Sequence, residues 1–170
     1  MAPAQLRDQL QEFRPADAQA VDALGLASFE QFSALYDDWP GFRAKISTMS
    51  SLAQAGEVIV ARRGDRIVGG VAYIGPHRPK GAFFPAEWAI MRMLVVSPEA
   101  RGQGLGRALA QACVQRAQRD NANVIGLHTS PIMSIALPMY LRMGFQLERD
   151  APPIHGVPYG IYAKALVKQD

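Results

Sequence analysis

The 170-residue sequence has a single cysteine, no long apolar run and no cluster of basic residues. Cys113 alone cannot form a disulfide within the chain, which favours a reducing compartment. No stretch approaches the roughly 20 apolar residues that cross a bilayer, and residues 1–4 lack the basic start of a secretory leader. We therefore expect a cytoplasmic protein without a membrane partner. Cys113 falls on the apolar face of an expected helix, which favours a packed thiol over a nucleophile.

Charge and histidine content argue against two further classes of function. The 18 basic and 15 acidic residues are spread along the chain and give a net charge of +3, which argues against a nucleic-acid surface. The three histidines, His77, His128 and His155, have no ligand spacing, so we expect no metal. With 49% hydrophobic residues the chain can bury one full core. We expect a single domain over residues 1–170, with 1–11 as a loose or helical lead-in.

A strand followed by a glycine-rich turn and a helix dominates the middle of the sequence. Apolar residues from Met91 to Val96 predict a strand, and Pro98 ends it because proline cannot donate to a sheet ladder. Glycines follow at the start of an amphipathic helix, in the run Arg101-Gly102-Gln103-Gly104-Leu105-Gly106. Several backbone N–H groups meet at such a turn and the helix dipole adds positive charge, so the segment suits a phosphate. A glycine-rich turn without any ligand is the simpler alternative.

Two common nucleotide motifs do not fit this turn. G-x-G-x-G lacks the spacing of the dinucleotide fingerprint, and no Gly-Lys-Ser/Thr is present. The run Arg101-x-x-Gly104-x-Gly106, preceded by Leu94-x-Val96-x-Pro98, instead closely resembles the acetyl-coenzyme A loop of the GCN5-related N-acetyltransferases, the GNAT superfamily. The resemblance implies acetyl-coenzyme A as cosubstrate, with its pyrophosphate on the loop amides. The positions that match the coenzyme-binding segment are Leu94, Val95, Val96, Arg101, Gly102, Gln103, Gly104, Leu105, Gly106 and Arg107.

A second segment resembles the other signature of this family. Met133, Ala136 and Tyr140 share one helical face, and the pattern A-x-x-x-Y-x-x-x-G-F begins at Ala136. The resemblance places Tyr140 beside the thioester sulfur and Met133 and Ala136 at coenzyme-contacting positions, although the family commonly has Asn where Met133 is. The simpler alternative is that Tyr140 is only a core residue. Pro138 removes a helical hydrogen bond, so we expect the helix to be bent or opened before Tyr140.

The resemblance also implies the reaction, which is direct attack of a neutral amine on the thioester. Amides near Leu94 and Val95 would stabilise the oxyanion, and Tyr140 would protonate the leaving thiolate. The family often has a Glu base on the central strand, but Ile90 occupies that position here. Glu87 is the nearest substitute as catalytic base. Relay of the proton through ordered water is the alternative.

Aromatic and acidic residues suggest the acceptor. The family frames its acceptor site with the two helices after the first strand, loop 77–88 and turn 152–158. Aromatic residues in these segments, with Asp37, Asp38 and Glu87, would suit a cationic amine that carries an apolar body, although packing or solvation also explains each of them. The aromatic residues are Phe29, Tyr36, Trp39, Phe83, Phe84, Trp88 and Tyr159.

Three interpretations follow. The leading one is an acetyl-coenzyme A-dependent N-acetyltransferase that acts on an amine of a small molecule or a protein, and we allow for a homodimer. A non-catalytic acyl-coenzyme A sensor of the same fold is the alternative, because Ile90 occupies the position of the base. A different nucleotide-binding module is the third, weakened because no acidic residue closes a ribose-binding unit.

The order of elements predicts an α/β (α+β) domain with a mixed sheet. The order also resembles the GNAT fold, which implies about four helices around a mixed, mostly antiparallel sheet of six to seven strands. A short first strand is expected near Phe13, and a proline-rich turn, 152–158, is expected to join the last two strands. The other expected strands are residues 58–61 and 67–73 in a hairpin, then 91–96, 124–129, 145–147 and 159–166. The expected helices are residues 17–35, 42–56, 105–120 and 132–143.

Overall fold

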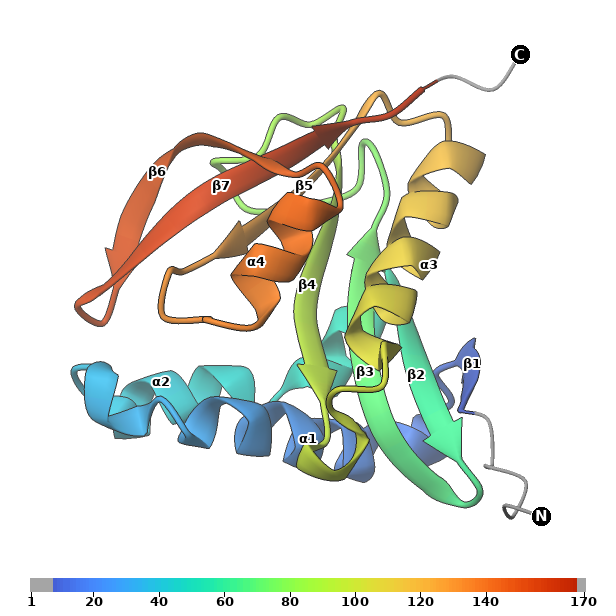
Figure 1. Ribbon diagram of the computed structural model, residues 1–170, viewed down its shortest axis with the longest axis vertical. Coiled ribbons are helices and arrows are strands. Elements are labelled where there is room, and N and C mark those ends of the chain that lie inside the picture. The colour runs from blue at the N-terminus through green and yellow to red at the C-terminus, as the bar shows by residue number, and fades with distance from the viewer. Residues whose placement is uncertain (1–7, 168–170) are drawn as a thin grey trace.

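The computed structural model describes residues 8–167 as one sheet with helices on both faces (Figure 1). The strands are β1 (Gln9–Glu12), β2 (Glu57–Arg63), β3 (Arg66–Ile74), β4 (Ala89–Val96), β5 (Val124–Thr129), β6 (Gln146–Ile154) and β7 (Val157–Ala165). They lie in the order β1-β2-β3-β4-β5-β7-β6, and every neighbouring pair is antiparallel except the parallel pair β4–β5. The predicted mixed, mostly antiparallel sheet is therefore confirmed.

Four α-helices flank the sheet within the described residues, as predicted. They are α1 (Ala18–Glu30), α2 (Trp39–Ile46), α3 (Leu105–Arg119) and α4 (Ala136–Arg142). Short 3₁₀ turns cover Pro15–Asp17, Ser33–Leu35, Met49–Gln54 and Pro98–Ala100. The helices α3 and α4 lie over the face of the sheet that is toward the viewer in Figure 1, and α1 and α2 pack on the opposite side. None of these helices is long and apolar enough to cross a membrane.

Alternating residues of the central strands supply a separate core to each face of the sheet. Val71 of β3 packs in the buried cluster that contains Leu109 of α3. Its neighbour Ala72 points to the other face, into the cluster of Val21 from α1 and Met49. Both faces of the middle strands are buried, which explains why their sequences read as apolar runs rather than as an alternation.

Local patterns predicted several elements correctly. The hairpin of β2 and β3 turns at Gly64, which has a φ of 59°, and β5 has the predicted bounds. The expected first strand near Phe13 is β1, which ends one residue earlier and takes up the end of the expected lead-in. Residues 1–7 of that lead-in lie outside the described residues. The two long helices expected before the hairpin each end early and continue as 3₁₀ turns.

The proline-rich segment 152–158 is not the turn that the sequence predicts. Pro152 and Pro153 lie within β6. The turn consists of His155 and Gly156, whose φ values are 43° and 80°. β6 is the last strand of the sheet and pairs only with β7, so a proline that lacks an N–H is tolerated on its outer edge. The sequence cannot reveal this because edge position depends on the whole sheet.

The helix that contains Tyr140 is also shorter than predicted. It begins at Ala136 instead of Ile132, and the preceding residues form a turn in which the Met133 amide donates to the Ser130 carbonyl. Pro138 is the third residue of α4, in the first turn, where a missing N–H removes no intrahelical bond. Pro138 therefore lies at the start of the helix, and the segment before Ala136 is open, which is one of the two outcomes expected before Tyr140.

A glycine in β3 lets α3 approach the sheet closely. A Cβ atom on Gly69 would lie 3.1 Å from Leu109 Cδ1, 3.2 Å from Leu105 Cδ2 and 3.3 Å from the Val95 carbonyl oxygen. Leu105 is the first residue of α3, so this contact fixes where the glycine-rich turn meets the sheet.

We expect Gly69→Val to lower the free energy of unfolding by about 1–3 kcal/mol, because the added methyl groups overpack Leu105 and Leu109. Urea denaturation followed by circular dichroism measures the change. Gly70→Ala is the control, since a Cβ there would make only an ordinary contact at 3.4 Å with Met49 Cε. We expect the control to change stability by less than about 0.5 kcal/mol. Equal losses in the two variants would contradict this account of the close approach.

Candidate active site

The two parallel strands β4 and β5 separate in the middle of the sheet. They pair only at Ala89 with Ile125 and at Ile90 with Gly126, although β4 continues to Val96. Backbone groups of β4 that face β5 beyond Ile90 therefore have no partner on that strand, and the sheet opens there. Unpaired N–H groups at the centre of a fold can bind a substrate oxygen.

A β-bulge in β4 lies beside this opening. Gly70 pairs with Val95 and Ala72 pairs with Arg92, so Met93 and Leu94 together oppose one residue of β3. Met93 has a φ of 56°, in the left-handed region. A bulge leaves its extra residue outside the regular ladder and redirects nearby backbone groups. The predicted oxyanion donors, the amides near Leu94 and Val95, are therefore in the irregular part of the strand, beside the opening.

The predicted phosphate loop forms the entry to α3. Gly102 and Gly104 have φ values of 74° and 80°, and nothing lies within 4 Å of the position of a Cβ on either residue. The first intrahelical bond of α3 runs from the Ala108 amide to the Gly104 carbonyl, at 3.0 Å. No side chain caps α3, and its first turn has no acidic residue. The amides of residues 105–107 therefore precede the first helical bond at an open helix end, which fits a pyrophosphate group.

Side chains of the loop hold its shape and stay on the surface. Arg101 donates from Nε to the Val96 carbonyl at 3.3 Å, and Gln103 donates from Nε2 to the Glu99 carbonyl at 3.2 Å. Gln103 also accepts a hydrogen bond from Arg63 Nη2 at 2.7 Å. These contacts tie the turn to its own flanks and to β2, so the backbone amides are held in place before any ligand arrives.

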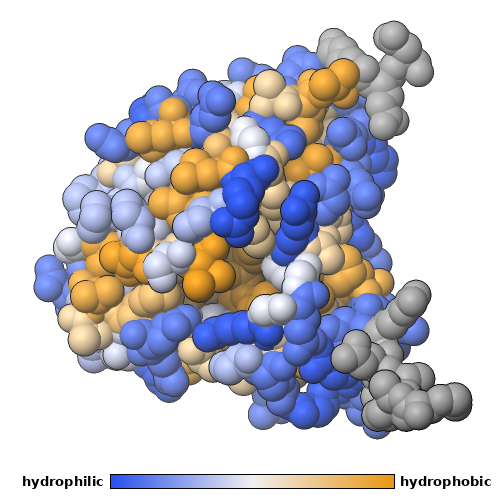
Figure 2. Space-filling model, in the orientation of Figure 1, coloured by the Kyte–Doolittle hydropathy of each residue, from blue (hydrophilic) through white to orange (hydrophobic). Residues whose placement is uncertain are grey.

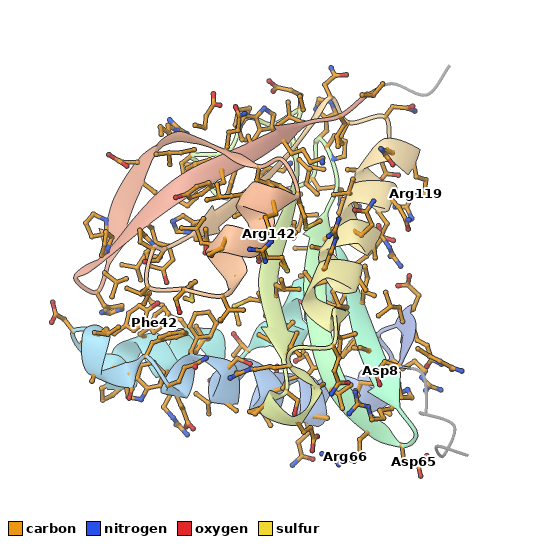
Figure 3. All side chains as sticks on the ribbon, in the orientation of Figure 1. Asp8, Phe42, Asp65, Arg66, Arg119 and Arg142 are labelled. Carbon is orange, nitrogen blue, oxygen red and sulfur yellow. The ribbon has the colours of Figure 1, made fainter. Side chains whose placement is uncertain are left out.

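The two sequence motifs lie side by side on one face of the sheet. A Cβ on Gly106 of α3 would be 3.6 Å from Met139 Sδ of α4, so the helices touch near the loop. The surface is hollowed beside α4 and the start of α3, with apolar residues around the hollow (Figure 2). Arg142 projects from α4 on the side of that helix that faces α3 (Figure 3).

Tyr140 is buried in this face of the protein. Its side chain is 6% exposed and packs edge-on against Phe145, with 5.8 Å between ring centroids. Burial and the neighbouring Cys113 thiol raise the pKa of Tyr140, so the phenol is protonated at neutral pH. Within residues 8–167, the one buried side-chain nitrogen or oxygen without a hydrogen-bond partner is His128 Nε2. The Tyr140 hydroxyl also has no hydrogen-bond partner among these residues. Because it is not one of the buried atoms without a partner, it must contact solvent.

The other residues predicted to contact the coenzyme lie in β4, in α4 or in the turn before α4. Leu94, Val96 and Ala136 pack against the same buried cluster as Tyr140. Met133 lies in the turn before α4, half-buried. Cys113 is fully buried in α3 and burial raises its pKa to about 12, as expected of a packed thiol.

Glu87 is not brought together with these residues. It is exposed and lines a separate cavity of about 500 Å³ with Gly75 and Asp120, before β4 begins. At about 3.3 Å per residue, the six steps from Ala89 to Val95 alone span about 20 Å. Ile90, at the family's base position, is fully buried. A base contributed by β4 at that position is therefore absent from the described structure.

The predicted acidic acceptor residues do not gather around one site either. Asp38 caps α2, where its carboxylate accepts from the Gly41 amide at 3.2 Å. Asp37 packs against Gly156 in the turn between β6 and β7. The Asp38 carboxylate is thus used in local structure, whereas Asp37 is exposed beside the β6–β7 turn.

The predicted aromatic residues do form a wall, on the opposite face of the sheet from Tyr140. Tyr36 stacks on Phe42 at 4.2 Å between ring centroids, and its hydroxyl lies 2.5 Å from that of Tyr159. Phe42 lies between α2 and the β6–β7 hairpin in Figure 3. Tyr159 in turn packs on His128 of β5 at 4.6 Å between ring centroids, and Phe83 packs on the other side of His128 at 5.0 Å.

Sequence analysis missed two residues at this opening, Arg92 and His128. Arg92 is an exposed cation in the middle of β4, and His128 is half-buried on β5. Burial, together with the positive charge of Arg92, lowers the pKa of His128 to about 4. One signal was available, because Arg92 is the single charged residue in the otherwise apolar run from Ala89 to Val96.

Comparisons with known proteins agree with this geometry. Residues 20–145 match the model of the acetyltransferase (GNAT) family, so the chain belongs to that family. The chain is 34% identical to rat N-acetyltransferase 8F1 over 99 residues, which are 58% of this chain and 43% of that protein. The chain thus matches less than half the length of this curated relative.

Solved structures show the same fold at low sequence identity. PaiA N-acetyltransferase from Thermoplasma acidophilum, in complex with coenzyme A, superimposes with a TM-score of 0.75 at 13% identity, over 94% of this chain and 99% of that one. YncA from Salmonella typhimurium, with its cofactor acetyl-CoA, gives 0.69 at 15% identity over 96% of each chain. Ard1 from Thermoplasma volcanium gives 0.74 at 16% identity over 95% and 99%. The GNAT fold predicted from the sequence is confirmed.

We expect Gly104→Asp to abolish most of the increase in melting temperature that acetyl-coenzyme A produces in the wild type by ligand linkage. The new carboxylate would project into the open space above the loop, where it would repel phosphate. Differential scanning fluorimetry and isothermal titration calorimetry measure the shift and the affinity, which should fall by at least about tenfold.

Gly104→Ala is the matched control, because it imposes the same left-handed strain, about 1–2 kcal/mol, without the charge. We expect it to melt earlier but to keep most of its coenzyme affinity. An unchanged affinity in Gly104→Asp would refute the assignment of the loop.

Proposed function

We propose that this protein is an N-acetyltransferase that moves the acetyl group of acetyl-coenzyme A to an amine of a small molecule or a protein. The observation that carries the proposal is the combination of three features in one protein. They are the open start of α3, the gap between β4 and β5 with its bulge, and the hydroxyl of the largely buried Tyr140. A phosphate site alone would need only the first of these features.

Acetyl-coenzyme A supplies an activated acyl group as a thioester. The open amides of residues 105–107 would hold its pyrophosphate, with Arg101 and Arg107 in the same loop. Backbone N–H groups of Leu94 or Val95 would stabilise the oxyanion that forms on the carbonyl, because β5 leaves that edge of β4 unpaired. The amine nitrogen forms a bond to the carbonyl carbon as the carbon–sulfur bond breaks.

Tyr140 would act as the general acid. Its raised pKa keeps the phenol protonated at neutral pH, so Oη can donate a proton to the leaving thiolate and regain one from solvent. The amine must lose a proton to become the product amide, and ordered water carries that proton to bulk. Relay through water is consistent with the buried Ile90 at the family's base position and with the separate cavity that Glu87 lines.

Tyr140→Phe removes only the hydroxyl and keeps the ring that packs on Phe145. We expect turnover to fall roughly 100-fold or more, since general acid catalysis contributes about 10²–10⁴. Release of free thiol from acetyl-coenzyme A in the presence of an amine library measures the rate. Affinity for acetyl-coenzyme A and the melting temperature are expected to change little.

Phe145→Leu is the control for packing, because it alters the contact with the Tyr140 ring and leaves the hydroxyl in place. We expect it to destabilise the fold with a smaller loss of rate. Normal turnover in Tyr140→Phe would make Tyr140 a core residue only. Binding of acetyl-coenzyme A by the wild type with no thiol release for any amine would favour the non-catalytic sensor.

Glu87→Gln tests the remaining base candidate. We expect full activity across the pH range, because Glu87 lines a different cavity. The pH dependence of kcat/KM, measured in both proteins, is the check. A loss of rate that is greatest at low pH would instead identify Glu87 as the base.

A further inference from the structure

Arg92 is in an unusual position for an exposed arginine. It belongs to β4, the fourth of seven strands, in a sheet that carries helices on both faces. The two residues before it along β4, Ile90 and Met91, are both buried, as is its cross-strand neighbour Ala72. Arg92 is nevertheless exposed, because it lies just beyond the last pair between β4 and β5. An exposed side chain at the centre of a covered sheet must face a recess.

The guanidinium has no anionic partner in the described residues. The ion pairs within residues 8–167 use Arg62, Arg63, Arg66, Arg116 and Arg119, and Arg92 is not among them. The surrounding protein lowers the pKa of Arg92 by desolvation, which fits a group in a recess better than one on a convex surface. A desolvated cation without a counter-ion costs free energy that a bound anion would recover.

The recess is on the acceptor side of the sheet. Ile90 packs with Phe84 and Ile161, and Met93 packs toward α1 and α2, so this face of β4 is opposite Tyr140. His128 lies near Arg92 across the opening and is neutral above pH 5 because its pKa is about 4. The aromatic rings of Phe83 and Tyr159 flank His128. The surroundings of Arg92 thus combine one unpaired positive charge with apolar walls.

We propose that Arg92 binds a carboxylate of the acceptor, so that the acetylated amine belongs to an amino acid with an apolar side chain. A guanidinium can hold a carboxylate through two parallel hydrogen bonds, which fixes orientation as well as charge. The inference rests on the proposed acetyl transfer and gives it a substrate class. It differs from the cationic acceptor that Asp37, Asp38 and Glu87 suggest in the sequence.

Paired acceptors test this role. A panel of amino acids is compared with the corresponding amines that lack the carboxylate, with L-phenylalanine and 2-phenylethylamine as the leading pair. We expect the wild type to prefer the amino acid in kcat/KM by about 10–100-fold, since a hydrogen bond to a charged group contributes about 1.5–3 kcal/mol. Arg92→Leu should abolish this preference, mainly through KM, and Arg92→Lys should restore part of it.

Arg78→Leu is the matched control, because Arg78 is an exposed arginine in the loop before β4, beside the separate cavity. We expect it to keep the preference. The increase in melting temperature with acetyl-coenzyme A should be the same in wild type, Arg92→Leu and Arg78→Leu. Retention of the preference in a folded Arg92→Leu would overturn the proposal, as would equal turnover of both members of every pair. Turnover of protein amines alone would overturn it too.

Product binding separates this proposal from the proposed activity. In the presence of coenzyme A, NMR titration compares N-acetyl-L-phenylalanine with N-acetyl-2-phenylethylamine. If the wild type turns over nothing but binds the carboxylate compound selectively, and Arg92→Leu does not, the activity fails and the anion site holds. Turnover of amines without carboxylate-selective binding would give the opposite result.

Discussion

The separation of β4 from β5 is the constraint on which the rest of the structure depends. Two parallel strands that pair at only two positions leave backbone polar groups without a strand partner in the centre of the protein. Such groups are costly when dry, so the gap has to be solvated or filled by a ligand. The bulge at Met93 and the exposed Arg92 lie beside this gap, and the open start of α3 follows the end of β4. A fully paired sheet would bury or close each of them.

The sequence was most informative where the signal is local. The turn at residues 101–106 needs glycines with positive φ and a helix start without a side-chain cap. Both properties depend only on residues that are adjacent in the sequence. The apolar runs of β4 and β5 likewise report burial on both faces of a central strand. Tyr140 could be located by motif, although its protonation and solvent access follow only from the surrounding helix packing.

Features set by distant parts of the chain escaped prediction. Pro152 and Pro153 read as a turn, but they lie in a strand because that strand is at the edge of the sheet. Asp38 caps α2 and Asp37 lies beside the β6–β7 turn, and the sequence does not reveal either placement. The role of Arg92 could not be predicted, because the sequence does not show that β5 separates from β4 beyond Ile90 and leaves this side chain exposed.

The division of the core into separate buried clusters has a consequence for how such a protein can change. Tyr140 and the start of α3 pack in one cluster, whereas Tyr36, Phe42 and Tyr159 pack in another on the opposite face. Substitutions that share no contacts have nearly additive effects on stability. The aromatic wall can therefore be remodelled without disturbing the packing that holds the phosphate loop. A lineage could acquire new acceptors by small steps while its donor chemistry stayed the same.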